Sequence, residues 1–288
     1  ANLRQELGTA LAETKPPTPA GMQTPDACSD VLLADRSRGE SGWAHNEDFD
    51  IDYFDSIYFV RQSILNADGQ ETYSFASFTY PGVLPGWAPG WNSYGLGMSW
   101  NVLYPSAMPA GPSVGVAFVC RDALSAKSIE EAIELATPTD LALGQNLNVG
   151  SFHSKRMVTV EIAPGGKNDV MDIVDEVTFH ANEYLRMQLP QAVSHLTSSR
   201  HRKRVFDSLT KSKKLHSMQD LLWVLGDTSD AAYPIFRRND TTREDTLFTI
   251  AFDLKERTIT TYRDNPRLGN ASELWVEHVS LDDEVLLV

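Results

Sequence analysis

Residues 28–49 read CSDVLLADRSRGESGWAHNEDF, and this stretch carries the strongest indications of both fold and chemistry. Residues 1–27 before it are polar and rich in proline, which is typical of a weakly structured tail or linker, with a short helix over 3–13 as the alternative. The apolar run at 31–33 then starts a segment of strand character. Cys28 therefore lies where a tail meets a strand, whereas a structural thiol usually lies inside an element.

The composition of the whole chain excludes several classes of protein. Its 288 residues, 42% of them hydrophobic, suffice for one large core or two modest ones. A net charge of −14 argues against a nucleic-acid partner, and the basic run 200–204 is interpreted mostly as a solvated helix face. The sequence contains no stretch of 18 apolar residues, so it predicts no membrane span. With only Cys28 and Cys120, we expect no disulfide framework, metal or cofactor, and a reducing compartment such as the cytoplasm.

The hydrophobic pattern predicts groups of strands separated by groups of helices. Strands are expected over 57–61, 72–80, 97–102, 114–119, 157–162, 174–180, 246–254 and 257–263. Helices are expected over 129–136, 200–209 and 217–225, the first behind a capping box at Ser128 and the last ending at Gly226. Cys120, at the end of the run 114–119, is then a buried thiol in a strand. This order indicates an α+β protein with two antiparallel sheets covered by helices.

Polar side chains gather in a few short motifs. Residues 44–49, AHNEDF, place four groups capable of acid, base or hydrogen-bond work in four positions, although a polar turn between strands has the same composition. A turn at 91–96, WNSYGL, and the segment 180–184, HANEY, add two asparagines. A single cysteine with histidine and asparagine elsewhere makes Cys28 a candidate nucleophile. The loop 81–91, with Trp87 and Trp91, fits a pocket wall and a core-packing loop equally.

In their order and spacing, these motifs resemble the penicillin acyltransferase-like branch of the N-terminal nucleophile hydrolases. Within that branch the sequence looks most similar to the β-alanyl-dopamine (carcinine) hydrolases of arthropods. The likeness continues through 78–86, 225–229, 252–259 and 264–266, so that it extends over nearly all of 28–288. It implies a four-layer αββα sandwich of two antiparallel sheets.

The resemblance also implies that the precursor cleaves itself between Ala27 and Cys28. Residues 1–27 would then be the C-terminal end of an α-subunit or propeptide-like segment, and 28–288 the catalytic β-subunit. The family usually has glycine before the nucleophile and a longer preceding segment. Alanine at position 27 is small enough for the same acyl shift.

Roles for individual residues follow from the same resemblance. Cys28 would be the nucleophile, with its own freed α-amine as general base, and Asp48 would bind that amine. Asn182 would donate its side-chain amide to the developing oxyanion, and Asn92 would supply a backbone N–H or its side chain to the same site. Arg202, in the pattern S-S-x-x-R, would stabilise the surroundings of the nucleophile, with Arg200 and Arg204 as alternative matches. His45, where a distant relative has arginine, is expected to support its loop and not to act as a base.

The predicted activity is the hydrolysis of a small N-acyl amine such as N-β-alanyl-dopamine or carcinine. We expect Tyr80, Trp87 and Trp91 to contact the substrate, and Asp50, Asp52 or Asp55 to receive its free amino group. An N-acyltransferase that uses coenzyme A thioesters or amides is the alternative, because it shares the acyl-enzyme. A silent binding protein on the same fold is a third hypothesis. No nucleic-acid or membrane partner is expected, whereas the cleaved subunits would stay together, with a homodimer as an option.

Overall fold

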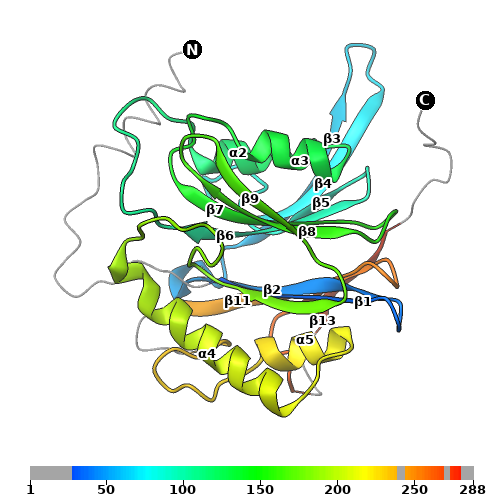
Figure 1. Cartoon of the computed structure of the whole chain (residues 1–288). Helices are drawn as coiled ribbons and strands as arrows, with labels where there is room; N and C mark the ends of the chain where they lie inside the picture. Colours follow the sequence, from blue (N-terminus) through cyan, green and yellow to red (C-terminus); the bar gives the residue numbers. More distant parts are fainter. Residues whose placement is uncertain (1–27, 239–243, 269–272, 280–288) are drawn as a thin grey trace.

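Two antiparallel β-sheets lie face to face, and helices cover both outer surfaces (Figure 1). The computed structural model describes residues 28–238, 244–268 and 273–279. The helix considered over 3–13 and the expected cleavage segment up to Ala27 lie outside these residues. The order of layers is helices, sheet, sheet, helices, which confirms the predicted αββα sandwich.

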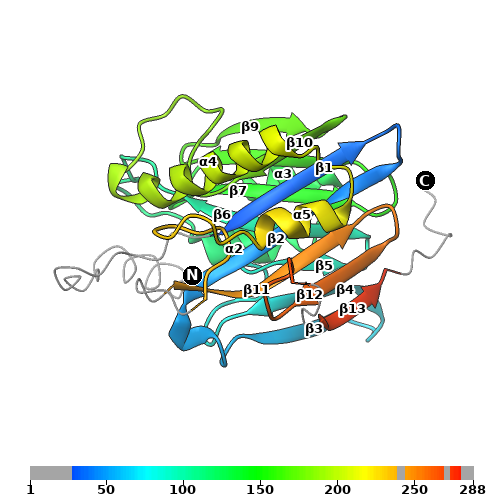
Figure 2. The ribbon, with the colours of Figure 1, turned by 90° about the horizontal axis from the view of Figure 1, so that it is seen from below.

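The first sheet has six strands, and Cys28 directly precedes its strand β1. Its order is β10 (Glu176–His180), β1 (Ser29–Asp35), β2 (Glu40–Asp50), β11 (Glu244–Asp253), β12 (Thr258–Tyr262) and β13 (Glu273–His278). Helices α4 (Leu196–Ser212) and α5 (Met218–Leu225) lie over its outer face (Figure 2). A 3-10 turn, η2 (Val193–His195), leads into α4.

The second sheet has seven strands that follow one another in chain order. They are β3 (Tyr58–Leu65), β4 (Glu71–Thr79), β5 (Gly90–Asn92), β6 (Leu96–Leu103), β7 (Gly144–Ser151), β8 (Met157–Ala163) and β9 (Lys167–Asp172). Helices α2 (Val116–Ala123) and α3 (Ile129–Ala136) cover this sheet, and the 3-10 turn η1 (Ile51–Tyr53) connects the two sheets.

The β1–β2 hairpin shows how the sequence produces the first sheet. Along β1, Val31 and Leu33 pack into the cluster under α4 and α5, whereas Leu32 packs between the sheets. Such alternation follows from the two-residue period of a strand. Gly39 closes the turn with a φ of +66°, a conformation that glycine adopts without strain. The hairpin therefore has one register, in which both faces of both strands are buried.

Most of the predicted elements are present, but the prediction of a strand over 114–119 is wrong. This run begins helix α2, which Gly115 precedes at the N-cap position, and Cys120 is buried inside that helix. A short apolar run fits a strand and a buried helix equally well, so the pattern alone did not decide. The AHNEDF motif lies inside strand β2 and is not a turn. The helix starting at Ser128 and the helix ending at Gly226 are confirmed.

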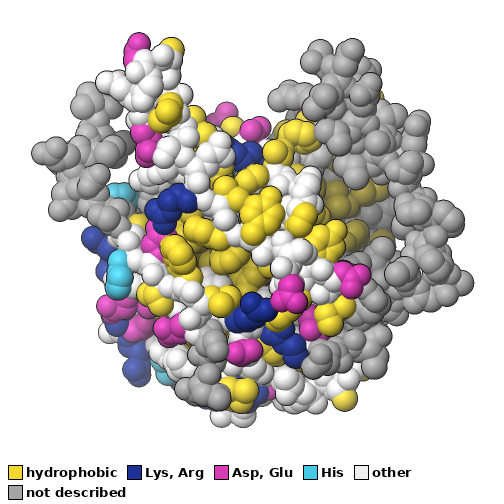
Figure 3. Space-filling view, turned by 180° about the vertical axis from the view of Figure 1, so that it is seen from behind, with side chains coloured by type: hydrophobic (Ala, Val, Ile, Leu, Met, Phe, Trp, Pro, Cys, Tyr) yellow, Lys and Arg dark blue, Asp and Glu magenta, His cyan; other side chains and the backbone are white. Residues whose placement is uncertain are grey.

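The sheets approach each other at their edge strands β3 and β13. The rings of Phe59 and Trp275 are 5.0 Å apart, and Arg61 forms an ion pair with Glu277 at 2.5 Å. Figure 3 views the molecule from behind and shows hydrophobic side chains gathered at the centre of this face. Among the residues that the structure describes, no helix has the length and the apolar character that a membrane span requires.

Two glycines of the second sheet make room for the largest inner-face side chains of the first. Trp43 and Phe252 stack with ring centroids 4.4 Å apart. A Cβ atom on Gly97 would lie 2.7 Å from the Phe252 ring, and one on Gly150 would lie 2.5 Å from the Trp43 ring. The close contact between the sheets at this point therefore depends on glycine.

We expect Gly97→Ala to destabilise the protein by about 1–3 kcal/mol, because the added methyl group overpacks the contact between the sheets. Urea unfolding followed by tryptophan fluorescence measures this loss. Gly111→Ala is the matched control, since a Cβ there has nothing within 4 Å. Equal stability of the two variants would contradict the packing explanation.

Candidate active site

Cys28 directly precedes strand β1 and belongs to a polar cluster between the two sheets. The cluster's other inward residues are Asp30 on β1, and His45 and Glu47 on β2. Cys28 and Asp30 are two positions apart, as are His45 and Glu47, so the two residues of each pair lie on the same face of the strand. The Cys28 Sγ, a ring nitrogen of His45 and a carboxylate oxygen of Glu47 all lie within 4.8 Å of one another. The thiol is only partly buried, whereas its neighbours are buried.

His45 lies between two carboxylates. Its Nδ1 is 2.9 Å from Asp30 Oδ1, and its Nε2 is 2.9 Å from Glu47 Oε2. Burial lowers the pKa of His45, but the charge of Asp30 and hydrogen bonds with Asp30, Cys28 and Glu47 outweigh it and hold that pKa well above 6.5. A protonated imidazole satisfies both carboxylates and cannot accept a proton from the thiol. The expectation that His45 is not the base agrees with this arrangement.

The carboxylate of Asp30 fixes the first sheet against the second. It accepts hydrogen bonds from Ser99 Oγ at 2.7 Å and from Asn101 Nδ2 at 2.6 Å, both on β6. On the other side of His45, the hydroxyl of Tyr80 donates to Glu47 Oε1. Glu47 and Asp30 thus each connect His45 to a different part of the second sheet.

Asp48 lies on the opposite face of β2 from Glu47, toward α4. Both of its carboxylate oxygens are buried, and neither has a hydrogen-bond partner in the described part of the chain. Burial raises the pKa of Asp48 to about 7, although the positive charge of Arg237, the nearby hydroxyl of Thr246 and the positive charge of Arg202 act to lower it. The thiol of Cys28 is 3.9 Å from the backbone oxygen of Asp48. A buried carboxylate without hydrogen bonds is unusual and calls for a donor that the described residues do not provide.

Arg202, among the three arginines considered from sequence, is the one that reaches Cys28. Its side chain is fully buried, and its guanidinium donates to the Cys28 backbone oxygen at 2.5 Å and to Ser29 Oγ at 2.8 Å. Arg200 instead pairs with Glu183, and the Arg204 side chain bonds the backbone of α4; both bonds are exposed to solvent. The prediction that the basic run is mostly a solvated helix face therefore fails at one position.

Arg202 also connects Cys28 to Asn182. The guanidinium donates to Asn182 Oδ1 at 2.8 Å, and the Asn182 side-chain amide donates to the Val102 backbone oxygen at 3.1 Å. An amide NH₂ has two donors, so the second N–H of Asn182 is not used by Val102. The structure thus brings Cys28, Arg202 and Asn182 together.

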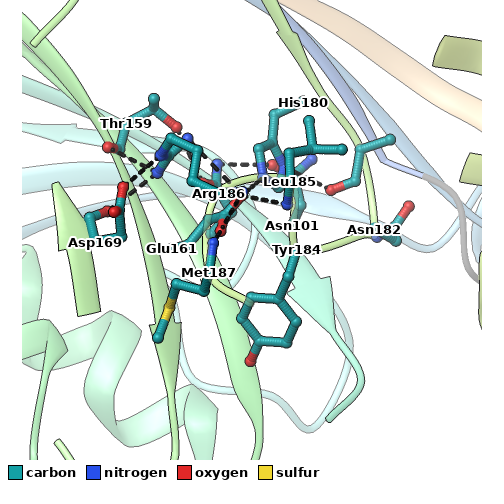
Figure 4. A network of polar contacts seen from close by, with 12 residues as sticks. Asn101, Thr159, Glu161, Asp169, His180, Asn182, Tyr184, Leu185, Arg186 and Met187 are labelled. Atoms are coloured by element: carbon teal, nitrogen blue, oxygen red, sulfur yellow. Dashed lines mark hydrogen bonds and ion pairs between the residues drawn. The ribbon is translucent and has the colours of Figure 1, made fainter. Parts of the chain in front are cut away.

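The segment that carries Asn182 is held by a buried glutamate, Glu161 on β8 (Figure 4). Glu161 pairs with His180 Nε2 at 3.0 Å. Its two oxygens also accept the backbone N–H groups of Leu185, Arg186 and Met187, at 2.7–3.2 Å. Despite burial, the hydrogen bond and charge of His180 and the amides lower the pKa of Glu161 to about 2. Asn182 lies within the turn that these bonds close.

Two of the predicted site residues lie elsewhere. The Asn92 side chain donates to the backbone oxygens of Leu124 and Ala126 at 3.0 and 2.8 Å, which turns it toward the helix layer of the second sheet. It stabilises its own turn and is not directed at the thiol. The Trp91 indole donates to Glu277 on β13 at 3.2 Å, and its ring packs in the apolar core between the sheets.

Tyr80 and Trp87, in contrast, lie at the polar cluster. The Tyr80 hydroxyl bonds Glu47, and the Trp87 ring is 5.9 Å from the Tyr80 ring. The acids proposed for the substrate amine do not join them: the Asp50 carboxylate caps η1, Asp52 is exposed, and Asp55 pairs with Arg263 at the surface. The loop 81–91 therefore serves both of its predicted functions, with Trp87 near the site and Trp91 in the core.

The surroundings of Cys28 keep its sulfur protonated in the intact chain. Burial and the negative charge of Glu47 raise the pKa of Cys28 to about 11, against a smaller opposing effect of His45. Attack by this sulfur therefore requires a base. Cys28, His45 and Glu47 are also ligand types for a metal ion, but the hydrogen bond between His45 and Glu47 would have to break to admit one.

Sequence reasoning missed Asp30, Glu47, Asn101 and Glu161 as members of the site. The first two had a signal, because the inward positions of a strand alternate and both stand two residues from another inward polar residue. Asn101 and Glu161 stand in runs without any motif, and only the sheet topology brings them to the cluster.

Comparison with known proteins places these motifs in one family. A family model described as acyl-coenzyme A:6-aminopenicillanic acid acyl-transferase matches residues 37–268, more than half of the chain. The β-alanyl-dopamine/carcinine hydrolase of Drosophila melanogaster is 28% identical over 268 residues, which cover 86% of this chain and 67% of that protein. The segment 37–268 that the family model matches includes His45, Asp48, Asn182 and Arg202.

Among solved structures, the chain is similar to an N-acylethanolamine-hydrolyzing acid amidase ortholog of Caenorhabditis elegans. The TM-score is 0.49 at 14% identity, covering 85% of this chain and 95% of that one. A mutant of the conjugated bile acid hydrolase from Clostridium perfringens has a TM-score of 0.48 at 13% identity, covering 90% of this chain and 100% of that one.

We expect Glu161→Gln to destabilise the protein by roughly 3 kcal/mol near neutral pH, because the folded-state pKa is lowered from 4.5 to about 2. A lowered pKa stabilises the fold above the unfolded value and stops doing so as the pH falls through the folded value. The stability difference between wild type and variant should therefore shrink between about pH 4.5 and about pH 2, which denaturant unfolding at several pH values measures.

Asp169→Asn is the matched control for this variant. Asp169 pairs with Arg186 of the same segment at 2.6 Å but is partly exposed, so its loss should cost less than about 1 kcal/mol. Hydrogen exchange at the amides of residues 185–187 should accelerate only in Glu161→Gln. Unchanged exchange there would contradict the anchoring role.

Proposed function

We propose that this chain, which belongs to the acyl-coenzyme A:6-aminopenicillanic acid acyl-transferase family and acts on amide bonds, is an amidohydrolase with an N-terminal cysteine nucleophile. It cleaves itself between Ala27 and Cys28 and then hydrolyses a small N-acylated amine. The observation that carries this proposal is the buried carboxylate of Asp48, which has no hydrogen-bond partner among the described residues, on a residue whose backbone oxygen lies 3.9 Å from the Cys28 sulfur.

Self-cleavage begins with attack of the Cys28 sulfur on the carbonyl carbon of Ala27. The carbon–nitrogen bond breaks, the proton that the thiol gives up passes to the nitrogen directly or through water, and the acyl chain is transferred to sulfur as a thioester. Water then hydrolyses the thioester, which releases the carboxylate of Ala27 and restores the thiol. The products are a free thiol and a free α-amine on the same residue, and no cofactor takes part.

The new α-amine supplies what both Cys28 and Asp48 lack. An α-amino group has a pKa of about 7.7–8.0, so at neutral pH it exchanges protons readily with a thiol, directly or through water. As an ammonium group it provides donors for the buried Asp48 carboxylate. The pair then holds the amine beside the sulfur, and the amine accepts the thiol proton when the sulfur attacks.

Turnover follows the same sequence of bonds. The sulfur attacks the substrate's amide carbon, the carbon–nitrogen bond breaks, and the α-ammonium group delivers its proton to the leaving amine. Water attacks the resulting thioester with the α-amine again as base, which releases the acid. The unused N–H of Asn182 is the side-chain donor for the oxyanion, and one such donor is worth about 2.7–4 kcal/mol.

The acyl group that we propose is β-alanyl, and the amine is dopamine or histamine. The similarity to the Drosophila hydrolase, whose name specifies β-alanyl-dopamine and carcinine, supports this assignment. The aromatic residues around Glu47 also suit a small aromatic or cationic ligand.

Transfer of the acyl group to an amine is the second candidate, because the family is described as an acyl-transferase. The acyl-enzyme is common to both reactions, and only its acceptor differs. Product analysis with and without an added amine separates them: hydrolysis yields free acid at the same rate in both cases, whereas transfer yields a new amide that depends on the added amine.

We expect Cys28→Ala to abolish both chain cleavage and hydrolysis of N-β-alanyl-dopamine and carcinine. Intact mass and a gel report cleavage, and release of β-alanine reports turnover. Cys120→Ala is the matched control: it removes the other thiol, which is buried in α2, and should leave cleavage and turnover in place. Hydrolysis by Cys28→Ala at the wild-type rate would remove the mechanism.

We expect the stability of the uncleaved Cys28→Ala chain to fall by up to about 4 kcal/mol as the pH rises from about 4 to about 7. Burial raises the folded-state pKa of Asp48 from 3.8 to about 7, so the unfolded chain ionises first and gains relative to the folded one. Denaturant unfolding of Cys28→Ala with and without Asp48→Asn isolates this effect.

In the cleaved wild-type protein the α-ammonium group stabilises the Asp48 carboxylate, and the fall that depends on Asp48 should disappear. The same fall in cleaved and uncleaved protein would show that the new amine does not bind Asp48.

A further inference from the structure

The cluster beside Cys28 holds more negative than positive charge. Asp30 and Glu47 both pair with His45, which supplies at most one positive charge to two buried carboxylates. In the described part of the chain, these are the ion pairs that the two acids form. Asp30 accepts two further bonds, from Ser99 and Asn101 of β6, whereas Glu47 accepts one further bond, from Tyr80, so that among the described residues Glu47 is the less fully satisfied acid. A buried charge that is not balanced costs several kcal/mol.

The Glu47 carboxylate has acceptor capacity left for another hydrogen-bond donor. Its side chain accepts one bond from His45 and one from Tyr80. A carboxylate has about four acceptor positions, so these bonds use about half of its capacity. Glu47 also disfavours the thiolate of Cys28, since its charge raises the pKa of that thiol. A cation bound to Glu47 would remove that penalty at the moment when the thiolate is needed.

Aromatic rings form the wall next to Glu47. The Tyr80 ring lies 4.9 Å from Phe49, 5.4 Å from Tyr53 and 5.9 Å from Trp87. Phe49, Tyr53 and Trp87 are half-buried, so the wall is open to solvent on one side, whereas Tyr80 is buried. Aromatic rings around a tyrosine whose hydroxyl bonds a carboxylate are a favourable environment for an ammonium group, which ring faces attract and the carboxylate binds.

The spacing matches an acyl chain with a β-amino group. Three bonds separate the carbonyl carbon of such a group from its nitrogen, and three bonds in extended form span roughly 3.8 Å, as between consecutive Cα atoms. A carboxylate oxygen of Glu47 lies within 4.8 Å of the Cys28 sulfur. When the sulfur contacts the carbonyl carbon, the nitrogen of an extended β-alanyl group can therefore reach Glu47.

From this juxtaposition we infer that Glu47, with the rings of Phe49, Tyr80 and Trp87, forms the subsite that binds the terminal ammonium group of the acyl chain. The inference rests on the proposed hydrolase function and identifies the residue that selects its substrate. It replaces Asp50, Asp52 and Asp55, whose carboxylates lie outside the polar cluster. Glu47 is thus a specificity residue, because it contacts the acyl chain of the substrate and leaves the reacting amide to other groups.

The test compares two substrates that differ only at this ammonium group: N-β-alanyl-dopamine and N-butanoyl-dopamine, in which a methyl group replaces it. We expect the wild-type protein to prefer the β-alanyl substrate by at least tenfold in kcat/KM. Glu47→Gln should reduce this preference by about tenfold or more, with the larger change in KM. Glu130→Gln is the matched control, because it makes the same charge change at the surface, where Glu130 of α3 forms an ion pair with Arg156. This variant should leave the preference intact.

A second readout applies if Glu47→Gln does not turn over. β-Alaninamide should slow the alkylation of Cys28 by iodoacetamide in the wild-type protein and should not slow it in Glu47→Gln, whereas butanamide should protect neither. Phe49→Leu, which keeps the carboxylate, should weaken the protection by a few fold.

The outcomes separate this inference from the proposed function. Equal hydrolysis of both dopamine amides by the wild-type protein would leave the hydrolase in place and overturn the ammonium subsite. Hydrolysis of neither, together with protection of Cys28 by β-alaninamide, would retain the subsite and overturn the hydrolase. Undiminished preference in an active Glu47→Gln would show that another group binds the amine.

Discussion

The buried guanidinium of Arg202 is the group on which the candidate site depends. It bonds the Cys28 backbone oxygen and Ser29 on one side and Asn182 on the other, and it comes from a helix of the outer layer. A fully buried arginine is tolerated only when its donors are used, so these contacts are obligatory for the fold. The start of β1, the turn after β10 and helix α4 are therefore held in one arrangement. These contacts of Arg202 therefore fix the position of Cys28, the proposed nucleophile, relative to Asn182, the proposed oxyanion donor.

A second constraint is the two-residue period of strand β2. Within His45–Asp48, the odd positions face the second sheet and the even positions face α4 and α5. Asn46 shows this directly, because its amide donates to backbone oxygens at Leu225 and Ile235 under the helices. Asp48 therefore lies on the side of Arg202, and Glu47 on the side of Tyr80. One short motif thus places the acid proposed for the new amine of Cys28 and the acid proposed for the substrate on opposite faces of the strand.

The period of two also explains how much was predictable. Segments with a clear pattern, such as 72–80, or with a clear cap, such as Ser128, formed the expected elements because local preference and packing agree there. The run 114–119 has no polar positions that distinguish a strand from a helix, and its helix is decided by packing on the second sheet. Asn92 had the right motif, but its amide N–H groups donate to the backbone oxygens of Leu124 and Ala126 after α2, and its Oδ1 accepts from the backbone of its own turn. Motif order thus indicated the family, and only three-dimensional placement showed which asparagine is available.

The proposed reaction accounts for the two buried acids of the site, Asp48 and Glu47. Burial keeps the Cys28 thiol protonated, and the described part of the chain offers no donor to the Asp48 carboxylate, which is unfavourable for the folded protein. In the proposed reaction, cleavage before Cys28 would create a cation at that point and satisfy Asp48, so that folding energy would favour the product of the first step. Glu47 repeats the same principle for the substrate. Its excess negative charge is unfavourable until an ammonium group arrives, and that group then lowers the cost of forming the thiolate. In the proposed mechanism each buried acid would be balanced by the cation that its own step of the reaction brings, and this would link selectivity to activation of the sulfur.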